Sequence, residues 1–234
     1  AARADLSGGQ VGEIAGTLFG ATLIVAVLAL VLKPFLSPTD AAFTSCFQGA
    51  IRPYTYIGLV PAILFWGDQG LAMISIAVLA VVPLVNVLSV TVLVIWGEGH
   101  KGARTPMRAV REVVRNPLVI ACAVGFGLGA LDVGLPPVIM PLLDILGRAA
   151  LPIALMAVGA GLDFPDLLTN RWLAGKTSLL KLLILPAVAW GLADVIGLEG
   201  QALQVTILYA ALPMSASSYV LAREMGGDAP LAAG

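Results

Sequence analysis

Residues 41–66 read AAFTSCFQGAIRPYTYIGLVPAILFW, an apolar stretch long enough to span a bilayer but interrupted at its middle by Arg52 and Pro53. Proline removes a backbone donor and clashes with the preceding turn, so this stretch predicts a helix broken at mid-membrane depth. Residues 201–222, QALQVTILYAALPMSASSYVLA, repeat the design with Pro213 near their centre. Two interrupted spans in corresponding positions point to the substrate site of a secondary transporter.

The composition of the 234-residue chain is that of a membrane protein. The chain is 59% hydrophobic and 12% charged, with a mean hydropathy of +0.97, whereas soluble domains are about 25% charged. A net charge of -1 gives no footprint of a nucleic-acid partner. The sequence has no cluster of Cys and His residues and no nucleophile with a base partner. It therefore predicts no metal site, no cofactor and no enzymatic activity.

Seven apolar segments have the length of a membrane span, which is about 20 residues. They are residues 11–32, 41–66, 69–95, 116–133, 136–162, 173–194 and 201–222. The one long hydrophilic loop, residues 97–115, carries more Lys and Arg than Asp and Glu. Because cytoplasmic loops collect Lys and Arg, we expect this loop to face the cytoplasm.

The basic loop divides the chain into two parts that we interpret as repeats: residues 1–96, the loop 97–115, and residues 116–234. One span separates the first interrupted segment from the loop, whereas the second interrupted segment is the fourth span after the loop. Both positions fit if each half is a repeat of five spans whose fourth span is broken. Because five is an odd number, the two repeats then have opposite orientations in the membrane. The chain then holds spans three to five, and six to nine with the start of ten. The prediction is an all-α polytopic membrane protein with an inverted-repeat transporter fold and seven of ten spans present.

Arg52 is the strongest indication of a binding residue. A guanidinium near the bilayer centre is costly and normally faces protein or a water-filled cavity. Its planar donors match the oxygen pair of a carboxylate. Two structural interpretations remain open: an ion pair with Asp144 or another buried acid, and a shallower position from which Arg52 extends to the interface.

Hydroxyl groups gather at both breaks. In lipid, backbone groups freed by a break must be satisfied, and Ser or Thr side chains often do so. The hydroxyls are therefore either structural or in contact with the substrate. The predicted substrate-binding set is Arg52, Pro53, Tyr54, Thr55, Pro213, Ser215, Ser217, Ser218 and Tyr219.

Other polar residues within the spans have an ionic or a structural interpretation. Asp144 and Arg148 lie four residues apart, hence on one helix face, which favours a mutual pair over a proton or ion site. Asn86 is a lone amide, and such amides more often bond across helices than bind a ligand. Lys181 lies nearer the end of its span and is expected to extend to the interface.

Short motifs in a specific order support a family resemblance that covers essentially the whole chain. They are FQGAIRP at 47–53, TYIGL at 55–59, VPLVNV at 82–87, NPL at 116–118, LGRAALPIAL at 146–155, VG at 158–159, Pro213, YVLA at 219–222 and Asp228. In order and spacing they resemble the auxin efflux carrier family of bacterial and plant transporters.

The resemblance implies ten helices in two inverted repeats, with helices four and nine crossing at their proline breaks. It also implies a homodimer, a scaffold part, a moving transport part, and small organic anions as substrates. The chain departs from the family at Tyr54, where Asn is frequent, and at Ser217 and Ser218, where Asn is also common.

The sequence thus predicts an efflux-type secondary carrier of small organic anions in the bacterial inner membrane, working by alternating access. Its partners would be the substrate, the lipid bilayer and a second copy of the chain. The coupling ion, H⁺ or Na⁺, stays open. Two alternatives are a sodium-coupled symporter of the bile-acid type, and a seven-helix receptor or sensor module.

Overall fold

The computed structural model describes residues 8–98, 106–131, 136–161 and 164–233. Within these ranges every regular element is a helix. The helices are α1 Gly8–Val31, α2 Lys33–Leu36, α3 Asp40–Ile51, α4 Thr55–Trp96, α5 Pro106–Arg115, α6 Pro117–Ala130, α7 Ile139–Gly161, α8 Phe164–Thr169, α9 Arg171–Leu179, a π-helical turn Leu180–Ile184, α10 Leu185–Ile196, α11 Gly200–Ala210, α12 Ser217–Met225 and α13 Ala229–Ala233.

Three stretches of the described chain are long and apolar enough to cross a membrane: Gly9–Val31, Thr55–Trp96 and Arg171–Ile196. They confirm an all-α membrane protein, whereas the count of seven spans and the inverted repeat stay predictions. The second stretch bends at Gly67, whose backbone angles (φ 58°, ψ -139°) are accessible to glycine and strained for other residues. This bend lies between the predicted spans 41–66 and 69–95.

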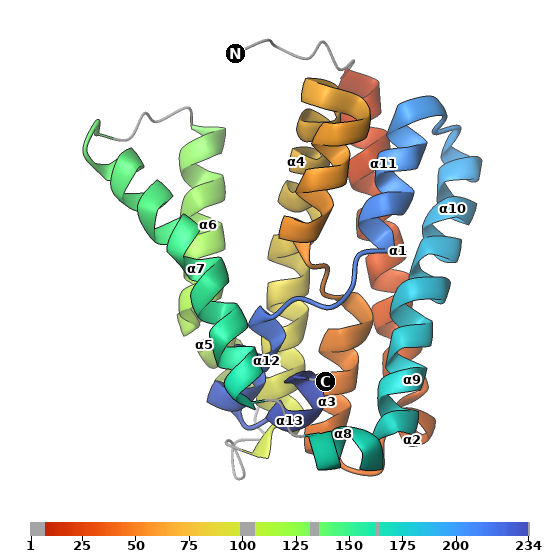
Figure 1. Cartoon of the computed structure of the whole chain (residues 1–234), viewed down its shortest axis with the longest axis vertical. Coiled ribbons are helices and arrows are strands. Elements are labelled where there is room, and N and C mark those ends of the chain that lie inside the picture. Colours follow the sequence, from red (N-terminus) through yellow and green to blue (C-terminus); the bar gives the residue numbers. More distant parts are fainter. Residues whose placement is uncertain (1–7, 99–105, 132–135, 162–163, 234) are drawn as a thin grey trace.

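The main bundle consists of α1, α4, α10 and α11, with α3 and α9 below (Figure 1). Helix α1 contacts α4, α10 and α11. Fully buried alanines line these contacts, including Ala21 and Ala29 of α1 and Ala189 and Ala193 of α10. Small residues let helix backbones approach closely in lipid. Helices α6 and α7 stand apart from the bundle (Figure 1) and contact it through α4, α12 and α13.

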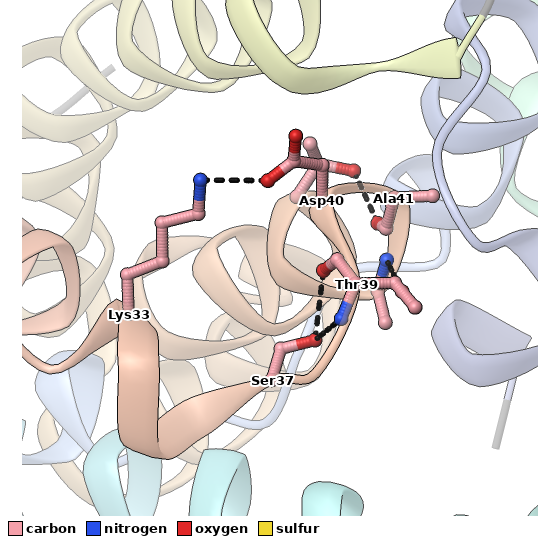
Figure 2. Close-up of polar contacts among 7 residues, drawn as sticks. Lys33, Ser37, Thr39, Asp40 and Ala41 are labelled. Carbon is pink, nitrogen blue, oxygen red and sulfur yellow. Dashed lines mark hydrogen bonds and ion pairs between the residues drawn. The ribbon is translucent and has the colours of Figure 1, made fainter.

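A polar turn sets the direction in which α3 enters the bundle (Figure 2). Thr39 caps α3 by accepting a hydrogen bond from the Ala42 N–H (3.2 Å), and Lys33 Nζ pairs with Asp40 Oδ1 at 2.7 Å. The Lys33 ammonium also lies 4.5 Å from the ring centroid of Trp96, the last residue of α4. Because the ion pair is partly exposed, it contributes little energy and mainly fixes geometry.

Both interruptions predicted from proline are present. Helix α3 ends at Ile51, and Arg52 adopts the extended backbone (φ -82°, ψ 117°) that a following proline favours. Helix α4 begins at Thr55. Likewise α11 ends at Ala210 and α12 begins at Ser217, with Pro213 between them.

The two interruptions meet and cross near the middle of the molecule (Figure 1). The Tyr54 N–H donates to the Pro213 carbonyl at 2.8 Å, and Pro53 and Met214 form an isolated antiparallel bridge. Each break thus satisfies a backbone group that the other leaves without a helical partner, as an apolar environment requires. We call these residues, 52–54 and 213–215, the crossing.

Gly49 is the point of closest packing beside the crossing. A Cβ there would collide with Thr177 Cγ2 of α9 and lie 3.3 Å from Met214 Sδ. We expect Gly49→Ala to lower the melting temperature of the detergent-solubilised full-length protein, with a cost of about 1–3 kcal/mol from overpacking.

Two variants serve as controls for this prediction. Gly175→Ala places a Cβ on α9 where no atom lies within 4 Å, so its melting temperature should not fall. Adding Thr177→Ser to Gly49→Ala removes the colliding methyl group and should restore stability. A double variant as unstable as Gly49→Ala alone would contradict the packing account.

Candidate functional site

The guanidinium of Arg52 lies at the crossing and is surrounded by neutral partners. Arg52 is 4% exposed. Its Nη1 donates to Gln48 Oε1 (3.4 Å), and its Nη2 donates to Asn86 Oδ1 (3.1 Å) and Ser217 Oγ (2.9 Å). These partners come from α3, α4 and α12, so Arg52 joins both broken helices and the long helix beside them.

The positive charge of Arg52 is not neutralised by any residue that the structure describes, since no carboxylate pairs with it. Three hydrogen bonds use three of the five guanidinium N–H groups. A buried charge normally requires an ionic partner as well as hydrogen bonds. Arg52 therefore offers both charge and donors to an anion.

A cavity of about 620 Å³ opens beside Arg52. One part of its lining is polar, with Arg52, Asn86, Ser215 and Ser217. The other part is apolar and belongs to α4, with Leu59, Val78, Leu79, Val82 and Val85. The cavity can therefore hold a molecule that has one polar end and one apolar end.

The predicted hydroxyl residues divide between those that line this cavity and those that do not. Ser215 Oγ and Ser217 Oγ lie 2.9 Å apart, and both residues line the cavity, as do Pro53 and Thr55. The Thr55 hydroxyl contacts Tyr209 OH at 3.4 Å. Tyr54 and Pro213 form the backbone crossing and line a different cavity, described below.

Two of the predicted binding residues lie outside the cavity. Ser218 is fully buried, and its hydroxyl has no hydrogen-bond partner in the part of the chain that the structure describes. Tyr219 OH accepts a hydrogen bond from Arg223 Nη1 at 3.3 Å. Neither residue lines the cavity beside Arg52.

Of the three residues with an ionic or structural interpretation, only Asn86 lines this cavity. Asp144 Oδ2 and Arg148 Nη2 lie 2.9 Å apart on an exposed face of α7, and neither lines the cavity. The Asn86 amide instead bonds across helices: its oxygen accepts from Arg52, and its nitrogen donates to Cys122 Sγ of α6 at 3.3 Å.

Sequence reasoning did not assign a role to Gln48 or Tyr209, and it placed Lys181 incorrectly. Gln48 is one helical turn before Arg52, a spacing that could have identified it as a partner. Tyr209 is buried one turn before Pro213 and carried no such signal. Lys181 is 2% exposed, so it does not extend to the interface; the π-helical turn that contains it could not be read from the sequence.

Residues 98–233 match the protein family described as membrane transport protein, the family of the auxin efflux carriers. The chain belongs to this family. It is therefore a multi-pass membrane transporter. No curated protein matches the chain. The matched region of this membrane transport protein contains the second break, whereas Arg52 and the first break precede it. The crossing thus joins the matched region to the preceding part of the chain, which supplies Arg52.

Ser217 and Ser218 provide a test of the hydrogen bonding around Arg52. Ser217→Ala leaves a buried guanidinium N–H without its acceptor, so we expect it to destabilise the transporter by about 1–3 kcal/mol. Ser218→Ala removes a buried hydroxyl that has no partner among the described residues, so its effect on stability should be neutral or stabilising.

Thermal unfolding of both variants in detergent measures this difference. Equal losses of stability, or a larger loss for Ser218→Ala, would contradict the observed network.

Proposed function

We propose that this transporter is an efflux-type secondary carrier of small organic anions, which bind at the crossing of the two broken helices. Arg52 carries the proposal: it is a buried cation whose partners among the described residues are all neutral, and it lines a cavity of about 620 Å³. In the proposed complex, the carboxylate of the substrate supplies the missing negative charge.

The rest of the lining supports an amphipathic carboxylate. Ser215 and Ser217 can orient the anionic end, while the aliphatic residues of α4 can cover a hydrocarbon or aromatic part. Among the described residues that line the cavity beside Arg52 there is no Asp or Glu. This lining disfavours the sodium-coupled bile-acid-type symporter, because none of these residues is a carboxylate that could offset the repulsion between Na⁺ and the Arg52 guanidinium. The family match favours a carrier over a seven-helix receptor.

Alternating access needs one part of the molecule to move against another. We propose that the bundle carrying the crossing is the moving part, and that α6 and α7 belong to the scaffold. Support comes from their separation from the bundle, which they contact through α4, α12 and α13 (Figure 1). The proposal includes two inverted repeats, a homodimer in the bacterial inner membrane, and a cytoplasmic basic segment at 97–115, which the sequence predicted as a loop and which contains helix α5.

Uptake by proteoliposomes that hold the full-length protein tests the anion assignment. Radiolabelled benzoate and succinate represent mono- and dicarboxylates. We expect Arg52→Gln to reduce carboxylate transport about tenfold or more, because hydrogen bonds to charged groups contribute about 1.5–3 kcal/mol. The matched control is Arg148→Gln, which changes an exposed arginine of α7 and should transport like the parent protein.

Transport by Arg52→Gln at the parental rate, with Arg148→Gln equally active, would contradict a role for Arg52 in binding. A panel of carboxylates that the parent protein does not transport would contradict the anion assignment itself.

A further inference from the structure

A second cavity, of about 300 Å³, adjoins the crossing. It shares Ser215 with the cavity beside Arg52, and otherwise different residues line the two. Pro53 faces the Arg52 cavity, whereas its neighbour Tyr54 and the partner segment Pro213–Met214 face the second one. The crossing therefore separates two cavities.

The ammonium of Lys181 belongs to this second cavity. Lys181 lines it and is 2% exposed. In the described part of the chain, Lys181 has neither an ion pair nor a hydrogen-bond partner. A buried ammonium without a counter-ion costs several kcal/mol. Such a residue indicates that a ligand supplies the missing charge.

The backbone at Lys181 is also irregular. Residues Leu180–Ile184 form a π-helical turn, in which the Leu185 N–H donates to the Leu180 carbonyl and not to that of Lys181. Pro186 follows and has no N–H of its own. Widened turns of this kind are rare and occur frequently at functional sites.

The remaining lining suits a carboxylate attached to an apolar group. Ser178 precedes Lys181 by three residues, about one helical turn, and lines the same cavity. Its hydroxyl has no hydrogen-bond partner among the described residues. Leu155, Val158 and Leu182 supply apolar surface. An ammonium acts as a compact point charge that one anionic oxygen can neutralise.

We propose that Lys181 and Ser178 form a second binding site for a small carboxylate, on the other side of the crossing from Arg52. The position of this site is inferred from the cavity lining alone, and only the choice of a carboxylate as the probe rests on the proposed function. A carrier with a cationic site on each side of its crossing can hold the anion at two successive positions.

Equilibrium binding of radiolabelled benzoate to the purified full-length protein tests the second site. We expect two binding sites per chain in the parent, one in Arg52→Gln, one in Lys181→Met, and none in the double variant. Benzamide, the uncharged counterpart of benzoate, should not compete. Lys176→Met is the matched control, because Lys176 is exposed and hydrogen-bonded to the Phe35 carbonyl; it should bind like the parent.

A second readout separates binding from folding. Lys181→Met removes an unneutralised buried charge, so its melting temperature should equal or exceed that of the parent. If Lys181 is purely structural, Lys181→Met will lower the melting temperature and leave benzoate binding unchanged. That result would overturn the proposal.

The binding counts also separate the two proposals. If only the second-site proposal is wrong, the parent will bind one benzoate per chain, and this site will be lost in Arg52→Gln and kept in Lys181→Met. Failure of the Arg52 assignment alone appears as one site that only Lys181→Met abolishes. Absence of saturable benzoate binding in the parent overturns both.

Discussion

The hydrogen bond from the Tyr54 N–H to the Pro213 carbonyl joins two segments that proline removes from helical geometry. In an apolar environment these segments are tolerated only because they satisfy each other. The bridge between Pro53 and Met214 and the close approach of Gly49 to Met214 belong to the same crossing. It is the crossing that places Arg52 and Ser217, 165 residues apart in sequence, within 2.9 Å.

Charge is distributed unusually around this crossing. Arg52 and Lys181 are both buried, and neither is paired with a carboxylate within the ranges described. A basic side chain without a carboxylate partner beside each of two neighbouring cavities favours an anion in either cavity. Ser215 lines both cavities and Ser217 lines the one beside Arg52, so their hydroxyls offer polar contacts that do not neutralise a charge.

The sequence predicted the features that depend on local chemistry. Pro53 and Pro213 located both breaks. The cost of a charge in lipid predicted that Arg52 faces protein or a cavity, and the structure places it there. It did not separate Ser217, which contacts Arg52, from Ser218, whose hydroxyl has no partner within the described ranges, because that difference depends on the rotation of α12 about its axis. Nor did it predict the burial of Lys181, since position along a span does not determine which face packs inward.

A structure of the full-length transporter with 4-iodobenzoate bound tests the central claim most directly, because iodine marks the position of the ligand. The account predicts iodine density in the cavity beside Arg52 and the carboxylate within hydrogen-bonding distance of the guanidinium. Ligand density outside both cavities, with Arg52 still bonded only to Gln48, Asn86 and Ser217, would contradict it.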